Sequence, residues 1–105
     1  MDKQEQKKQY LSAYLLQEAK IERLKRMIDK NPANEKLYKE YIEKSQKIRT
    51  EIEEKISAVD DELLSELLFQ KYVFGHTLEQ VGYIINYSKR QTERLHRKAL
   101  EKLIL

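Results

Sequence analysis

The sequence predicts an all-α protein, and three observations favour that class. The 105 residues include only two glycines and one proline, so few turns can interrupt regular structure. Lysine, glutamate, glutamine and leucine, all good helix formers, are abundant. Apolar residues recur at intervals of three and four, which places them on one face of a helix. We expect an N-terminal helical hairpin or coiled-coil arm over residues 1–57 and a C-terminal helical domain over residues 58–105.

The first predicted helix runs from Asp2 or Gln4 to Lys30. Its apolar residues alternate in steps of four and three, which is typical of a coiled-coil seam. The predicted seam consists of Tyr10, Tyr14, Gln17, Ile21, Leu24 and Ile28, widened by Leu11, Leu15 and Met27.

The second predicted helix runs from about Pro32 to Ser57. Asn31 is a good N-cap, and Pro32 suits the first helical position because its missing N–H would have no partner there. The apolar stripe is thin and its middle, residues 43–47, is polar. A thin stripe suits a two-helix hairpin within one chain or a seam between two chains. The stripe consists of Leu37, Tyr38, Tyr41, Ile42, Ile48, Ile52 and Ile56.

The third predicted helix follows an acidic cluster, Asp60 to Glu62, which suits the positive end of a helix dipole. Gly75 is a plausible C-terminal cap. This segment has the richest apolar face in the chain, so we place it at the centre of the C-terminal core. Its apolar residues are Leu63, Leu64, Leu67, Leu68 and Tyr72.

Two capping boxes follow, at Thr77-x-x-Gln80 and Ser88-x-x-Gln91. The first predicts a short helix with Leu78, Val81, Ile84 and Ile85 buried, and Gly82 allowing a neighbouring helix to approach closely. The second predicts a helix over residues 88–103. A short helix, a tight turn and a longer capped helix form the pattern of a helix-turn-helix. The predicted inward stripe of the last helix is Thr92, Leu95, Ala99 and Leu103, with His96 and Leu100 beside it.

Charge is concentrated on that last helix. Residues 57–75 carry one lysine against four acidic residues, a net charge of −3, whereas residues 88–98 carry five basic residues against Glu93, a net of +4. A clustered basic stripe is typical of nucleic-acid binding. A solvated lysine-rich helix face is the alternative interpretation.

We therefore predict that residues 88–103 form a recognition helix in the major groove of double-stranded DNA. The residues nearest its N-terminus, Lys89, Arg90 and Arg94, are assigned to base edges or adjacent phosphates. Arg97, Lys98 and Lys102 are assigned to phosphates.

Four polar residues complete the predicted DNA-binding set. Ser88 caps the recognition helix, and Gln91 either completes that cap or reads adenine. Glu93 either accepts from cytosine N4 or orients a neighbouring arginine. Thr77, at the start of the preceding helix, offers free N–H groups to a second phosphate.

Several other functions are not expected. The chain has no cysteine, so a disulfide framework and a thiolate metal site are excluded. The two histidines, His76 and His96, have no companion ligands, so we expect no metal site, no cofactor and no enzyme activity. No apolar run approaches the roughly 20 residues that cross a bilayer. The polar N-terminus does not read as a signal peptide, so a cytoplasmic protein without membrane contact is expected.

The segment "KYVFGHTLEQVGYIINYSKRQTERLHRKALEKL" resembles region 4 of the sigma-70 family over about a third of the chain. By that resemblance, Lys89, Arg90 and Arg94 fall where region 4 reads promoter DNA. The residues that carry it are Tyr72, Gly75, Thr77, Leu78, Glu79, Val81, Ser88, Ala99, Leu100, Lys102 and Leu103.

The chain has a helical N-terminal half, then Tyr87-Ser88 before the last helix and "RLHRKAL" within that helix. In this combination it is similar to small phage and prophage regulators of Gram-positive bacteria, the ArpU-like and RinA-like proteins. This resemblance implies activation of late packaging and lysis genes. The other sigma regions, which melt promoters and bind the polymerase core, have no room here. A promoter-proximal activator is therefore expected rather than a replacement sigma subunit.

Three hypotheses remain open from the sequence. The leading one is a DNA-binding transcriptional regulator whose N-terminal helices form a homodimer or contact RNA polymerase; a dimer would place recognition helices about 34 Å apart. The second is a DNA-packaging protein like a phage terminase small subunit. The third is a helical adaptor that binds only protein.

Overall fold

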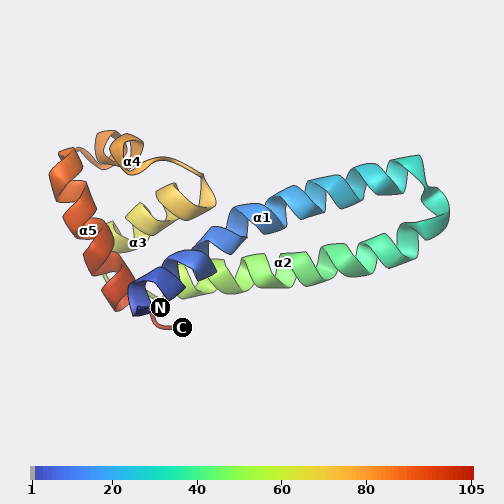
Figure 1. Ribbon diagram of the computed structural model, residues 1–105, viewed down its shortest axis with the longest axis horizontal. Helices are drawn as coiled ribbons and strands as arrows, with labels where there is room; N and C mark the ends of the chain where they lie inside the picture. The colour runs from blue at the N-terminus through green and yellow to red at the C-terminus, as the bar shows by residue number, and fades with distance from the viewer. Residues whose placement is uncertain (1) are drawn as a thin grey trace.

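The structure is a computed structural model that describes residues 2–105, and these residues form an all-α molecule without a β-strand, as expected. The molecule is elongated, with principal extents of 51 × 26 × 25 Å. Two long helices lie side by side, and the remaining helices gather at one end of that pair (Figure 1). The elements are α1 (Lys3–Lys30), a 3₁₀ turn η1 (Pro32–Asn34), α2 (Glu35–Ser57), α3 (Glu62–Leu68), a π-helical segment η2 (Phe69–Val73), α4 (Leu78–Ile85) and α5 (Lys89–Lys102).

Helix α1 begins where the sequence indicates. The Asp2 carboxylate accepts from the Glu5 N–H at 2.7 Å and so caps the first turn. The predicted seam is buried for most of its length, but Leu15 is 40% exposed because it lies beside the seam rather than on it. The buried residues of α1 are Leu11, Tyr14, Gln17, Ile21 and Leu24.

The predicted start of the second helix is wrong by one turn. The Asn31 N–H bonds back to the Met27 carbonyl at 2.9 Å, so Asn31 closes α1 and its side chain makes no cap. Residues Pro32–Asn34 then form a 3₁₀ turn, and α2 begins only at Glu35. Proline is the first residue of this 3₁₀ turn, which separates the two helices. The turn replaces the first α-helical turn that was expected at these positions.

The predicted buried stripe of α2 also needs correction. Leu37, Tyr41 and Ile48 are 44%, 44% and 40% exposed. Only one narrow face of α2 meets α1, and this face runs through Ile42, Ser45, Ile52 and Ile56. The small side chain of Ser45 lets a polar stretch pack against α1. Leu37, Tyr41 and Ile48 therefore lie beside the contact with α1 and take no part in it.

Polar bonds join the two long helices along one flank. The Tyr14 hydroxyl donates to the Glu53 carboxylate. The pKa of Tyr14 is raised well above its ordinary value, mainly because the hydroxyl is buried and secondly because of this hydrogen bond. Arg49 and Glu18 approach to 3.6 Å. Both side chains of that ion pair are partly exposed, so it contributes less than about 1 kcal/mol.

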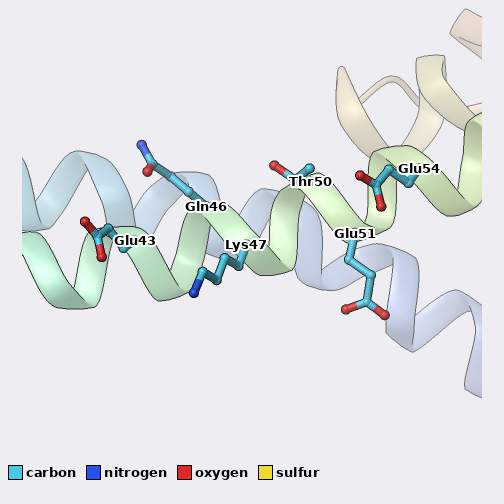
Figure 2. A pocket seen from close by; sticks show the side chains of 6 residues that line it. All are labelled: Glu43, Gln46, Lys47, Thr50, Glu51 and Glu54. Carbon is cyan, nitrogen blue, oxygen red and sulfur yellow. The ribbon is translucent and has the colours of Figure 1, made fainter.

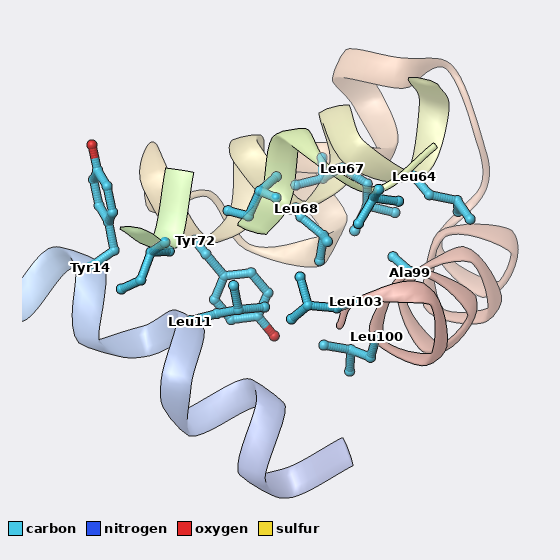
Figure 3. Packing of buried hydrophobic residues seen from close by; sticks show 13 residues of the cluster. Leu11, Tyr14, Leu64, Leu67, Leu68, Tyr72, Ala99, Leu100 and Leu103 are labelled. Atoms are coloured by element: carbon cyan, nitrogen blue, oxygen red, sulfur yellow. The ribbon is translucent and has the colours of Figure 1, made fainter. Parts of the chain in front are cut away.

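The main core lies where the helix pair meets α3, η2, α4 and α5 (Figure 3). Each fully buried leucine or isoleucine contributes about 1.5–3 kcal/mol by leaving water. A smaller cluster of Ile21, Leu24 and Ile42 continues along the helix pair. The main core consists of Leu11, Tyr14, Ile52, Ile56, Val59, Leu64, Leu67, Leu68, Tyr72, Val81, Ala99, Leu100 and Leu103.

The third predicted helix changes pitch part-way. Asp61 caps α3 by accepting from the Leu64 N–H at 3.0 Å. The chain widens into a π-helical segment over Phe69–Val73 and ends at Gly75, whose φ of +77° is the left-handed conformation expected of a C-terminal glycine. The wider turn places Tyr72 in the core with 5% of its surface exposed.

Helix α1 is also tied directly to the last helix. The Lys7 ammonium donates to the Leu100 carbonyl at 2.7 Å and to the Glu101 carbonyl at 3.4 Å. These carbonyls lie in the last turn of α5, where a cation is favoured by the helix dipole. Residues far apart in the sequence therefore hold the end of α5.

Candidate nucleic-acid interface

Both predicted capping boxes are present. The Gln80 N–H donates to Thr77 Oγ1 at 3.2 Å, and the Thr77 N–H donates to Gln80 Oε1 at 2.8 Å. The second box repeats the pattern at Ser88 and Gln91, with distances of 3.2 and 3.0 Å. Helices α4 and α5 therefore begin at the residues that the sequence indicates.

A close helix contact forms the turn between them. Asn86 ends α4 in the left-handed conformation, with φ of 63°. A Cβ added at Gly82 would lie 2.9 Å from both the Tyr87 carbonyl oxygen and Thr92 Oγ1. The Thr92 hydroxyl donates to the Ser88 carbonyl at 2.7 Å. Any larger residue at position 82 would force these atoms to shift, so the close approach predicted there is confirmed. Ile84, predicted to be buried, is 50% exposed because α5 covers only one side of this short helix.

The inner face of α5 is set by the core. Thr92, Ala99 and Leu100 are fully buried, and Leu103 is 1% exposed just beyond the helix. Leu95, predicted to face inward, is half-buried at the edge of the core. This packing fixes the rotation of α5 about its own axis, so the opposite face is presented to solvent.

The outer face of α5 is basic, although the exposed Glu101 lies four residues after Arg97. Five side chains on it are exposed, and none takes part in the ion pairs found within residues 2–105. By contrast, Lys102 at the end of the helix pairs with Asp60 at 3.6 Å. Glu93 is the half-buried acidic residue beside this face. The five exposed residues are Lys89, Arg90, Arg94, Arg97 and Lys98.

Gln91 had two predicted uses, and the structure shows one of them. Its Oε1 atom accepts from the Ser88 N–H, so the acceptor end of the amide serves the cap. Thr77 and Ser88 likewise use their hydroxyl oxygens within their own helices. These three residues position the start of each helix.

Two shallow hollows flank the start of α5, and they share one side chain. That side chain was not among the residues predicted from the sequence to bind DNA. Tyr87 lines both, one with Tyr83 and Lys89, the other with Arg94 and Lys98. Tyr83 is 82% exposed and Tyr87 is 40% exposed, so neither packs in the core. The sequence does contain a signal for these two tyrosines. They are four residues apart across the turn, and Tyr83 lies on the side of α4 opposite its apolar residues.

His96 holds the inner face of α5 to the π-helical segment. Its Nε2 lies 2.7 Å from the Tyr72 hydroxyl, and the two rings are 5.8 Å apart. The pKa of His96 is lowered from 6.5 to about 4, mainly by burial and secondly by the positive charges of the nearby Lys71, Lys8 and Arg97. The imidazole is therefore neutral at pH 7, and its hydrogen bond with the Tyr72 hydroxyl ties α5 to the π-helical segment.

Other hollows lie on the surface of the described residues. One of them follows the outward side of α2 and is lined by polar and charged side chains (Figure 2). No group of three or more histidine, aspartate or glutamate side chains within residues 2–105 is placed to hold a metal ion. Over the same residues, every helix is too short or too polar to cross a membrane. The residues lining the α2 hollow are Glu43, Gln46, Lys47, Thr50, Glu51 and Glu54.

Comparison with known proteins returned no match to a family model, a curated protein or a solved structure.

Proposed function

We propose that the protein is a sequence-specific DNA-binding regulator that uses α4 and α5 as a helix-turn-helix. The observation that carries this proposal is the outer face of α5, where five exposed basic side chains make no ion pair with an acidic side chain of residues 2–105. The positive charges on such a face repel one another, and the negatively charged phosphates of DNA relieve this repulsion.

The geometry supports α5 as the helix that enters the major groove. Arg90, Arg94 and Arg97 are spaced by four and three residues and share the exposed face of the helix. Arginine can donate two parallel bonds to guanine O6 and N7, or hold a phosphate. Lys89 and Arg90 lie in the first turn, which reaches the base edges in helix-turn-helix complexes. Lys98 and Arg97 lie further along and suit the backbone.

The regulatory role rests on the resemblance to phage late-gene regulators and on the long helix pair. We propose that α1 and α2 form a hairpin arm that pairs with a second copy or contacts RNA polymerase, while α5 reads a promoter-proximal site. No catalytic constellation competes with this role among the described residues, so we propose a binding protein rather than an enzyme. A cytoplasmic location follows from the same proposal, because the DNA is there.

The test is binding of the purified protein to DNA fragments across a salt series. Each phosphate contact contributes a slope of about −0.9 to the plot of log K against log salt concentration. We expect the double variant Arg90→Ala plus Arg94→Ala to lose discrimination between its best site and random DNA by about tenfold or more per lost base contact. The matched control is Arg23→Ala plus Arg26→Ala, which removes the same charge from exposed positions on α1.

Each outcome decides something. Loss of site discrimination in the α5 variant, with the α1 control unchanged, supports recognition by α5. Equal loss in both variants means that only net charge matters. If the wild-type protein binds no DNA even at low salt, the proposal fails, and the basic face of α5 becomes a docking surface for an acidic protein. Ring-shaped assemblies larger than a dimer would favour the DNA-packaging alternative.

A further inference from the structure

Helix α2 carries a second apolar stripe that α1 does not cover. Leu37, Tyr41 and Ile48 are each at least 40% exposed, and Lys44 lies between the last two. The steps of four, three and four residues are those of alternating heptad core positions. This second stripe lies about 100° around the helix from the stripe that faces α1, by the angle per residue of an α-helix. A separate polar side is visible in Figure 2.

We infer that the second stripe of α2 docks onto the same stripe of a second copy of this chain, with the two α2 helices antiparallel. In this register, Leu37 packs against Ile48 of the second copy, and Tyr41 packs against Lys44 of the second copy. Each layer occurs twice, as a two-fold axis requires. The Lys44 stem covers the tyrosine ring while its ammonium reaches the ring face or solvent.

Charge complementarity fixes this register and direction. Glu40 and Lys47 occupy equivalent heptad positions beside the stripe, and antiparallel pairing sets each opposite the other residue of the second copy. Neither takes part in an ion pair within residues 2–105. A parallel, in-register dimer would instead place Lys44 directly against Lys44 of the second copy. Like charges in a core layer are unfavourable, so the antiparallel arrangement is preferred.

This inference specifies the pairing named in the proposed function, and its test uses no DNA, so either can fail without the other. The four layers span about 17 Å of helix, which makes a small interface that associates weakly and reversibly. The two α5 helices would lie at opposite ends of the dimer, well beyond the 34 Å expected of adjacent half-sites.

The first experiment is sedimentation equilibrium of the full chain over a wide concentration range. We expect a monomer–dimer equilibrium for the wild type. Ile48→Asp should raise the dimer Kd roughly hundredfold, because each dimer would bury two unpaired carboxylates. Leu16→Asp is the control, since Leu16 is 55% exposed on α1 and lies outside the stripe. Circular dichroism checks that both variants keep the helical content of the wild type.

A charge exchange then tests the register. Glu40→Lys alone and Lys47→Glu alone should each raise the dimer Kd roughly tenfold, by replacing two attractions with two repulsions. An equimolar mixture of these two variants should associate as the wild type does, because each variant supplies the charges that the other lacks. The inference is overturned if the wild type stays monomeric up to about 1 mM, if Ile48→Asp dimerises normally, or if the mixture associates no better than either variant alone.

Discussion

Acidification should destabilise this protein through one residue, His96. The imidazole is 6% exposed and hydrogen-bonded to the Tyr72 hydroxyl, and burial lowers its pKa to about 4 in the folded protein. In the unfolded chain the pKa of histidine is about 6.5. The unfolded state therefore binds a proton first as the pH falls, and the free energy of unfolding decreases between pH 6.5 and pH 4.

The magnitude follows from the two pKa values. Between pH 7 and pH 5 the unfolded histidine becomes almost fully protonated while the folded one stays neutral, which costs about 2 kcal/mol of stability. Most carboxylates remain ionised at pH 5, so the histidine contribution can be separated from general acid unfolding.

The assay is urea unfolding of the wild type and His96→Gln at pH 7 and pH 5. The variant should lose about 2 kcal/mol less than the wild type on acidification, whatever its stability at pH 7. His76→Gln is the control, because it removes a histidine outside the core. The reasoning is refuted if wild type and His96→Gln show the same dependence on pH.

Two further substitutions test the packing. Gly82→Ala should destabilise the protein by about 1 kcal/mol in thermal unfolding, because a Cβ held 2.9 Å from the Tyr87 carbonyl outweighs the better helix propensity of alanine; a more stable variant would contradict this. Leu67→Ala should lower the free energy of unfolding by about 2–5 kcal/mol, whereas Leu16→Ala at an exposed position should change it by less than about 0.5 kcal/mol; similar losses would place the core elsewhere.

Features encoded by neighbouring residues could be predicted from the sequence. The capping boxes at Thr77 and Ser88 need only a hydroxyl and an amide three residues apart, and both form as predicted. The first helix and the all-α class also follow from local spacing. The basic residues of α5 are exposed because their helical period opposes the apolar one, although DNA binding itself stays a prediction.

Features that depend on distant contacts could not be predicted. The stripe on α2 was assigned too widely, because periodicity alone cannot say which apolar residues α1 will reach. Asn31 is a local exception: its residue type favours an N-cap, but its N–H bonds to the Met27 carbonyl four residues earlier and closes α1. The π-helical segment arises where Tyr72 must meet His96, twenty-four residues later, and no local pattern indicates it. The exposure of Tyr83 depends in the same way on how little of α4 is covered by α5.

The contact between the first and last helices has a consequence for synthesis on the ribosome. Leu11 shares a core with Leu100 and Leu103, and Lys7 bonds to the carbonyls of residues 100 and 101. The pair of α1 and α2 is made from neighbouring segments and can form while the chain is still growing. The main core cannot close until the residues around position 103 have left the exit tunnel, because contacts of such long sequence separation need nearly the whole chain. Until then the core-facing residues of α1, Leu11 and Tyr14, are exposed to solvent. We therefore expect a nascent chain that stalls before α5 is made to bind chaperones.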